Sequence, residues 1–86
     1  MKLKVFTKAD CPNCPPAKAL ATKLEENGAK VEWYNLDEEE GLSEAVYFDV
    51  LSTPSLIVTD ESDCEVKAWR GEVPLIDQVQ KELQTK

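Results

Sequence analysis

The 86-residue sequence predicts an α/β fold in which helices cover both faces of a four-stranded mixed sheet. Two observations lead to this class. Segments rich in β-branched and aromatic residues alternate with segments whose apolar residues recur at helical spacing. Their order is β-α-β-α-β-β-α. The first β-α-β unit implies parallel strands with a right-handed crossover, and the last two strands are close enough in sequence to form an antiparallel hairpin.

The first three elements follow from changes in periodicity. Residues 2–7 alternate lysine with leucine and valine before Phe6, which predicts a strand. A helix is expected from Pro12 onward, ending at Asn27-Gly28, where glycine tolerates the left-handed conformation. Residues 29–36 are β-rich and predict the second strand. The first helix has one apolar stripe, formed by Ala17, Leu20, Ala21 and Leu24.

Residues 37–50 begin with acids, which suit a helix N-terminus, and so predict a second helix. Gly41 weakens this prediction, because glycine is a poor helix former. The apolar face expected for this helix consists of Leu42, Ala45, Val46 and Val50.

The last third of the chain predicts a hairpin followed by a helix. Residues 55–60 form a short buried strand, residues 60–63 turn the chain, and residues 64–71 return as the second arm. Pro74 suits the first position of the final helix. The residues expected on the inner face of that helix are Leu75, Ile76, Val79 and Leu83.

Length and composition indicate a single domain over residues 1–86. An apolar content of 42% and a charged content of 31% are typical of a globular protein. No apolar run reaches the roughly 20 residues that span a bilayer. The first ten residues turn polar after six and lack a secretory apolar region. We therefore expect a cytoplasmic monomer, in which cysteines serve chemistry rather than structure.

The net charge of −7 argues against nucleic acid as a partner. Residues 1–30 carry six lysines and three acids, whereas residues 31–65 carry eleven acids and no lysine or arginine. This asymmetry either serves solubility or steers a protein partner toward the molecule.

Two cysteines, Cys11 and Cys14, are spaced as a Cys-x-x-Cys pair at the expected start of the first helix, which predicts a redox motif. With Cys11 as N-cap and Pro12 at the first helical position, the positive end of the helix favours a thiolate. Cys14 then falls at the third position. Lys8 adds positive charge nearby, and Asp10 opposes it.

In the expected cycle, the Cys11 thiolate attacks a substrate disulfide, and Cys14 resolves the mixed disulfide. Apart from the redox-active Cys11–Cys14 disulfide, the cycle needs no cofactor or metal. Asn13, between Pro12 and Cys14, is expected to tune the reduction potential. Zinc needs four ligands, and the chain has no histidine and only one further cysteine, Cys64. The alternatives are a carrier of metal, metalloid or an iron–sulfur cluster, shared between two chains, and a pair of inert buried thiols.

The stretch FTKADCPNCPPAKAL resembles the C-P-x-C-x-x-A-K-x-L motif of glutaredoxins in the thioredoxin-fold family, and the resemblance extends along essentially the whole chain. It implies a thioredoxin fold and a dithiol–disulfide oxidoreductase that reduces protein disulfides. It also implies that Thr53-Pro54 is a cis bond. In this family Pro54 packs against the disulfide, and the backbone of Thr53 pairs with an extended substrate.

The departures from this family concern the electron donor. Lys8 resembles the basic residue with which glutaredoxins bind the glutathione carboxylate, but their Gly-Gly turn is absent. The stretch WRGEVP instead resembles the W-x-G-x-x-P of NrdH-redoxins, which accept electrons from thioredoxin reductase, with matches at Trp69, Gly71 and Pro74. Both donors are therefore open. The further candidate substrate contacts are Pro12, Asn13, Trp69 and Gly71, although Trp69 also suits a residue covering the sheet edge. Cys64 is expected to be a free thiol.

Overall fold

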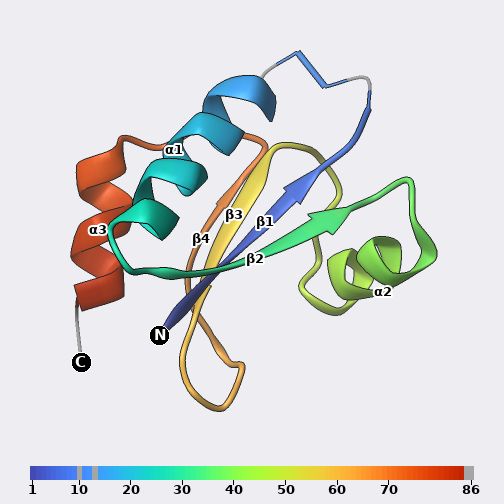
Figure 1. Cartoon of the computed structure of the whole chain (residues 1–86). Helices are drawn as coiled ribbons and strands as arrows, with labels where there is room; N and C mark the ends of the chain where they lie inside the picture. Colours follow the sequence, from blue (N-terminus) through green and yellow to red (C-terminus); the bar gives the residue numbers. More distant parts are fainter. Residues whose placement is uncertain (10, 13, 85–86) are drawn as a thin grey trace.

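The computed structural model describes residues 1–9, 11–12 and 14–84, which form one sheet and three helices (Figure 1). The observed order of elements is the predicted β-α-β-α-β-β-α. The elements are β1 (Lys2–Thr7), α1 (Cys14–Glu26), β2 (Lys30–Asn35), α2 (Glu39–Tyr47), β3 (Ser55–Thr59), β4 (Glu65–Arg70) and α3 (Ile76–Gln84).

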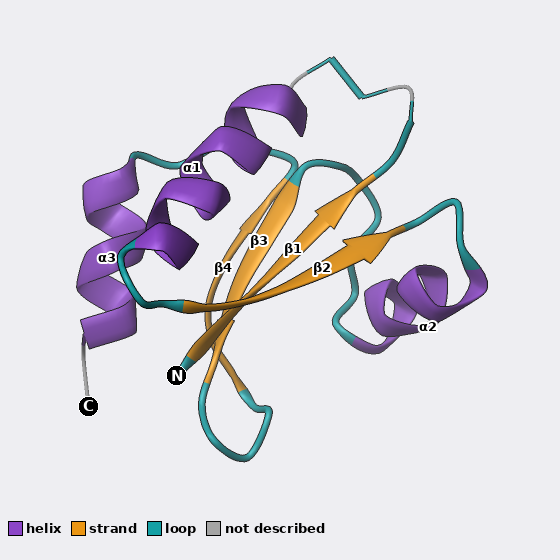
Figure 2. Ribbon diagram, in the orientation of Figure 1, coloured by secondary structure: helices purple, strands orange, loops and turns teal. Residues whose placement is uncertain are grey.

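The sheet is mixed, as predicted, with the strand order β2-β1-β3-β4. β1 and β2 are parallel, whereas β1–β3 and β3–β4 are antiparallel. Helices α1 and α3 cover one face and α2 the other (Figure 2). Consequently β1, β2 and β4 all finish at one end of the sheet, where β3 begins. We call this the site end.

The face under α1 and α3 holds the larger apolar core, and the predicted stripe of α1 is confirmed as part of it. Helix α1 ends in a Schellman motif, in which Gly28 has φ 96° and the Ala29 N–H donates to the Leu24 carbonyl over 3.0 Å. Glycine at this turn therefore fixes the start of β2. The buried members of this core are Leu3, Val5, Ala17, Ala21, Leu24, Leu56, Val58, Trp69 and Val79.

The final helix starts later than predicted. α3 begins at Ile76, so Pro74 is buried before the helix rather than at its first position. Leu75, expected on the inner face, is 71% exposed. The Leu75 N–H instead donates a capping hydrogen bond to the Gln78 side-chain carbonyl, at 2.9 Å. The apolar residues that do face the core are Ile76, Val79 and Leu83.

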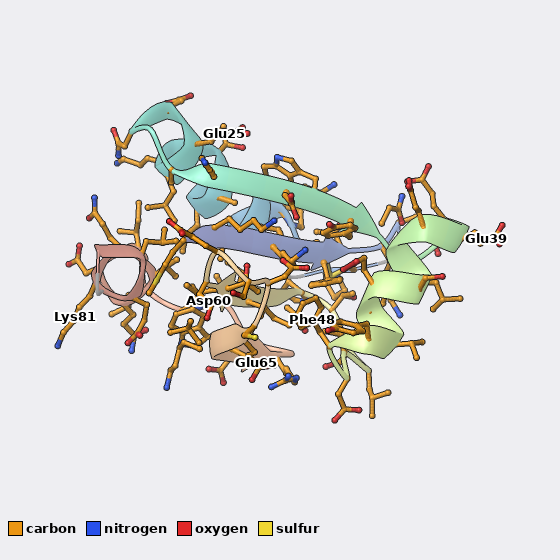
Figure 3. The ribbon with its side chains drawn as sticks, turned by 90° about the horizontal axis from the view of Figure 1, so that it is seen from below. Glu25, Glu39, Phe48, Asp60, Glu65 and Lys81 are labelled. Carbon is orange, nitrogen blue, oxygen red and sulfur yellow. A yellow bond between two sulfur atoms is a disulfide. The ribbon has the colours of Figure 1, made fainter. Side chains whose placement is uncertain are left out.

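The apolar face predicted for α2 is confirmed in part. Ala45 and Val50 are buried as predicted. Leu42 and Val46, however, are 51% and 73% exposed, and Gly41 faces the sheet in their place. Phe48, directly after the helix, lies between α2 and the strands (Figure 3). The second core cluster consists of Phe6, Ala45, Phe48, Val50 and Ile57. The smallest residue of α2 thus marks its contact face, because only glycine allows this approach to β2.

Replacing Gly41 by Ala should strongly destabilise the protein. A Cβ at Gly41 would lie 2.0 Å from the Asn35 carbonyl oxygen, a backbone atom that cannot turn away. Because α2 must shift to relieve this overlap, we expect a loss of about 2 to 3 kcal/mol in the free energy of unfolding, measured by urea denaturation. Gly28→Ala is the control: it meets no atom within 4 Å, and only its positive φ is strained. Equal losses in the two variants would contradict the packing role of Gly41.

The part of the sheet that α2 leaves open is covered by a charged cluster centred on Lys4. Lys4 is only 2% exposed, although lysine is rarely buried unless it is paired with an opposite charge. Its Nζ lies 2.9 Å from Glu32 Oε1 and 3.2 Å from the Tyr34 hydroxyl. It also pairs with Asp63 at 3.3 Å and with Glu44 at 3.6 Å. Three segments, β2, α2 and the turn after β3, thus place partners around the one ammonium group that β1 supplies.

The pKa values of this cluster predict how stability depends on pH. Burial alone would lower the pKa of Lys4. Its hydrogen bonds to Glu32 and Tyr34 outweigh burial, so the pKa of Lys4 lies above its ordinary value of 10.5. The bond from Lys4 lowers the pKa of Glu32 below 4.5. The contribution of Glu32 to folding stability is therefore complete above pH 4.5 and is lost as the pH falls through the lowered pKa of Glu32. The contribution of Lys4 is lost only when the pH rises through the raised pKa of Lys4. Urea unfolding between neutral and acid pH should show a shallower pH dependence for Glu32→Gln than for the wild type.

Candidate functional site

Cys11 and Cys14 form a disulfide at the site end, with their Cα atoms 5.3 Å apart. Cys11 lies in the connection after β1, and Cys14 is the first residue of α1. Cys11 is 8% exposed and Cys14 only 2%, so Cys11 is the more accessible of the two sulfur-bearing residues. This is the order of exposure that the attacking and resolving roles require.

The helix begins at Cys14 rather than at Pro12, which corrects the predicted cap. An α-helix starting earlier would need the N–H groups of residues 15 and 16 to bond the carbonyls of Cys11 and Pro12. Residues 15 and 16 are both prolines, which carry no N–H. The Cys11 carbonyl instead accepts a shorter turn bond from the Cys14 N–H, at 3.3 Å. Cys11 therefore precedes the helix by one turn, and the helix N-terminus coincides with Cys14.

The Thr53–Pro54 bond is cis, as predicted. The β1–β3 register pairs Phe6 with Ser55, so Pro54 lies one residue further toward the cysteines, beside the end of β1. Figure 1 shows the start of α1, the end of β1 and the start of β3 at this same end of the molecule. The structure thus brings the buried Pro54 and the cysteine pair to one end of the sheet.

Gly71 holds the chain that carries the cis bond. Its N–H donates to the Pro54 carbonyl at 3.0 Å and to Ser55 Oγ at 3.2 Å, and Ser55 Oγ in turn donates to the Ser52 carbonyl. Gly71 has φ 73°, and a Cβ there would lie 2.6 Å from Ser52 Oγ. This backbone conformation and close contact with Ser52 thus favour glycine at position 71. Thr53 is half-buried, and its hydroxyl has no hydrogen-bond partner among the described residues.

The remaining candidate residues are placed differently from one another. Lys8 and Pro12 are exposed beside the cysteines. Trp69 is 6% exposed in the core under α1 and α3, where it pairs with Leu56 across the hairpin. The indole of Trp69 thus covers the sheet under α1 and α3, and its contact with substrate stays a prediction. Asn13 and Asp10 lie outside the described residues.

One contact at the site end was missed by sequence reasoning. The Ala9 N–H donates to Asp37 Oδ2 at 2.9 Å, which joins the connection after β1 to the one after β2. The Leu36 N–H donates to the Thr7 carbonyl at 2.8 Å nearby. Because parallel strands end at the same edge, the sequence held a signal for this neighbourhood, but not for the bond itself.

Cys64 is an exposed free thiol beyond the β3–β4 turn, at the opposite end of the sheet from the cysteine pair. Among residues 1–9, 11–12 and 14–84, no three His, Cys, Asp or Glu side chains are grouped so as to hold a metal ion. Within the same part of the chain, the helices are too short or too polar to traverse a bilayer.

A four-stranded mixed sheet with a Cys-x-x-Cys disulfide at a helix N-terminus and a cis-proline at the same end defines a thiol–disulfide redox protein. The family model for the thioredoxin domain matches residues 1–84. The chain therefore belongs to the thioredoxin family.

Individual relatives agree. An Archaeoglobus fulgidus protein named Probable Thioredoxin is 33% identical over 60 residues, which cover 69% of this chain and 66% of the relative, just under two thirds of its length. A thioredoxin from Thermus thermophilus superposes with a TM-score of 0.67 at 22% identity, covering 95% of this chain and 69% of that one. Thioredoxin 1 of Thermosipho africanus gives 0.69 at 20% identity, covering 98% and 91%. The two solved structures support the fold.

Proposed function

We propose that this protein reduces disulfides in other proteins. The observation that carries the proposal is the Cys11–Cys14 disulfide at the N-terminus of α1. In the reduced form, the Cys11 thiolate attacks one sulfur of a substrate disulfide and expels the other as a thiol. Cys14 then attacks Cys11, releases the second substrate thiol and closes the disulfide. Two electrons and two protons pass to the substrate.

The positive end of α1 supports this division of roles, because the aligned peptide dipoles of the helix favour a thiolate near its N-terminus. Pro15 and Pro16 carry no N–H, and the Cys14 N–H already bonds the Cys11 carbonyl, so the effect comes from the helix dipole rather than from free N–H groups of these residues. Cys14, nearly inaccessible at 2%, reacts only with a sulfur already bonded to Cys11. The cycle runs on the cysteine pair alone.

The disulfide must be reduced again by a donor. Membership of the thioredoxin family and the W-x-G-x-x-P resemblance around Gly71 favour thioredoxin reductase; Lys8, exposed beside the cysteines, keeps glutathione as the second donor. Both donor systems operate in the cytoplasm, where we propose that this chain acts as a monomer.

The donor is identified by following NADPH oxidation while the protein reduces a model disulfide. One reaction contains thioredoxin reductase, and the other contains glutathione with glutathione reductase. Turnover with thioredoxin reductase alone is the expected result. Turnover with glutathione alone would assign a glutaredoxin-type circuit, and Lys8→Ala would then raise the KM for glutathione. Failure of chemically reduced protein to reduce any disulfide would refute the proposed function.

A further inference from the structure

The site end of the molecule carries an excess of acidic side chains. The connection after β2 and the first turn of α2 form the longest acidic run in the chain, residues 37–40, which we call the acidic arm. All four of its side chains are exposed, as is Glu72 after β4. Among the described residues at and just after the ends of β1, β2 and β4, the exposed cations are Lys8 and Arg70, and Arg70 is already paired with Glu65.

No ion pair among the described residues neutralises these charges. The ion pairs of the described residues join Lys2, Lys4 and Arg70 to other acids, all away from the acidic arm. Glu38 has the N-cap position of α2 but makes no side-chain cap bond. The negative charges of residues 38–40 and of Glu72 therefore produce a negative potential in the solvent next to the site end.

The acidic arm is fastened to the redox loop. The Ala9 N–H, two residues before Cys11, donates to the Asp37 carboxylate, and the Leu36 N–H bonds the Thr7 carbonyl. Asp37 is also held from its own backbone side, since its N–H donates to Asn35 Oδ1 at 2.9 Å. The arm thus has a fixed position relative to the cysteine pair, so a partner that reaches Cys11 meets it in one orientation.

An apolar contact lies on the segment that carries the cis bond. Leu51, three residues before Pro54, is 90% exposed, and Val73, two residues after Gly71, is 36% exposed. Gly71 bonds Pro54, so these two apolar residues belong to neighbouring segments. A partner at the site end is therefore offered acidic charge from one side and apolar surface along the segment before β3.

Resting on the proposed function, we infer that the partner of this site is a protein whose reducible disulfide lies in a basic exposed segment. Its lysine or arginine side chains face the acidic arm, and an apolar side chain packs on Leu51. The exchange is the one described above, with two electrons and two protons passing from the Cys11–Cys14 dithiol to the partner's disulfide. Charge complementarity then selects partners chiefly through the rate of encounter.

The test uses two disulfide peptides of equal length, one with lysines flanking its cysteines and the other with glutamates. The chemically reduced full-length protein is mixed with each peptide, and thiol release is followed in a single turnover, without any donor. At low salt we expect the basic peptide to react at least about tenfold faster than the acidic peptide. Raising the ionic strength to about 0.5 M shortens the screening length and should remove most of this preference.

A matched pair of variants locates the effect. The triple change Glu38→Gln, Glu39→Gln and Glu40→Gln removes the charge of the arm while keeping the Asp37 bond. The control triple removes the same charge from Glu25, Glu26 and Glu61, which lie at the opposite end; Figure 3 shows Glu25 and Glu39 far apart. The preference for the basic peptide should fall in the arm variant and persist in the control.

Equal rates for the two peptides, or equal effects of the two triple changes, would overturn the inference and leave the proposed function standing. No reaction with either peptide would instead overturn the proposed function itself. Leu51→Ser should slow both peptides alike, whereas Val46→Ser, at a residue 73% exposed on α2, should slow neither. A loss confined to Val46→Ser would place the apolar contact on α2 and contradict the assignment to Leu51.

Discussion

Replacing Cys11 by Ser should abolish the reduction of substrate disulfides, leaving only the background rate. A serine hydroxyl stays protonated at neutral pH and cannot displace a thiolate from a disulfide. Cys14 remains in this variant, but at 2% exposure it cannot reach an incoming disulfide. The measurement is single-turnover thiol release from a disulfide peptide, with the wild type alongside.

Cys14→Ser distinguishes the two roles. It should still attack substrate but stop at the mixed disulfide between Cys11 and the substrate, because the resolving thiol is missing. Mass spectrometry of the intact protein would detect the adduct, and a reductant would release it. An adduct on Cys14 in the Cys11→Ser variant, with none on Cys11 in Cys14→Ser, would reverse the assignment. Cys64→Ser, which alters the exposed thiol at the other end, should leave both results unchanged.

Lys4→Met should give the largest loss of stability expected in this chain, about 3 kcal/mol in the free energy of unfolding. Methionine fills a similar volume but removes the buried cation that faces Glu32, Glu44 and Asp63. Lys2 can still pair with Glu32 and Asp63, but no ion pair to Glu44 remains among the described residues. The loss is costly because Glu44 Oε2 and Asp63 Oδ1, the oxygens that face Lys4, are buried and would lose this cation. Urea denaturation at neutral pH measures the loss.

The matched control is Lys2→Met, on the same face of β1. Lys2 also pairs with Glu32 and Asp63, but its side chain is 30% exposed, and solvent screens such pairs. We expect a clearly smaller loss for Lys2→Met than for Lys4→Met. If Lys4→Met proved neutral or stabilising, the cluster would be replaceable by apolar packing, and its role in holding the fold would be refuted.

The order of the elements could be predicted because each has a strong local signal. The strand at residues 2–7 and the stripe of α1 alternate at the periods that their backbones impose. Lys4 could not be predicted as buried, because alternation says which face a residue occupies and not what covers that face. Its acidic partners come from distant segments, so only the assembled sheet reveals them.

The site was predictable in its chemistry but not in its details. The Cys-x-x-Cys spacing and the Thr53–Pro54 bond follow from local sequence and family resemblance. The start of α1 was predicted two residues too early, because Pro15 and Pro16 have no N–H groups to bond the carbonyls of residues 11 and 12. Gly41 suggested a weak helix, whereas its function is a close backbone contact that propensity does not describe.

The charged cluster around Lys4 has a consequence for the lifetime of the fold. Its members come from β1, β2, α2 and the turn after β3, so they can assemble only when these parts are already in place. Contacts that form late in folding slow unfolding and have little effect on the folding rate. The cluster lies on the opposite face of the sheet from α1 and does not involve the cysteines. The cluster therefore slows unfolding in the reduced state as well, when the Cys11–Cys14 disulfide no longer links the chain.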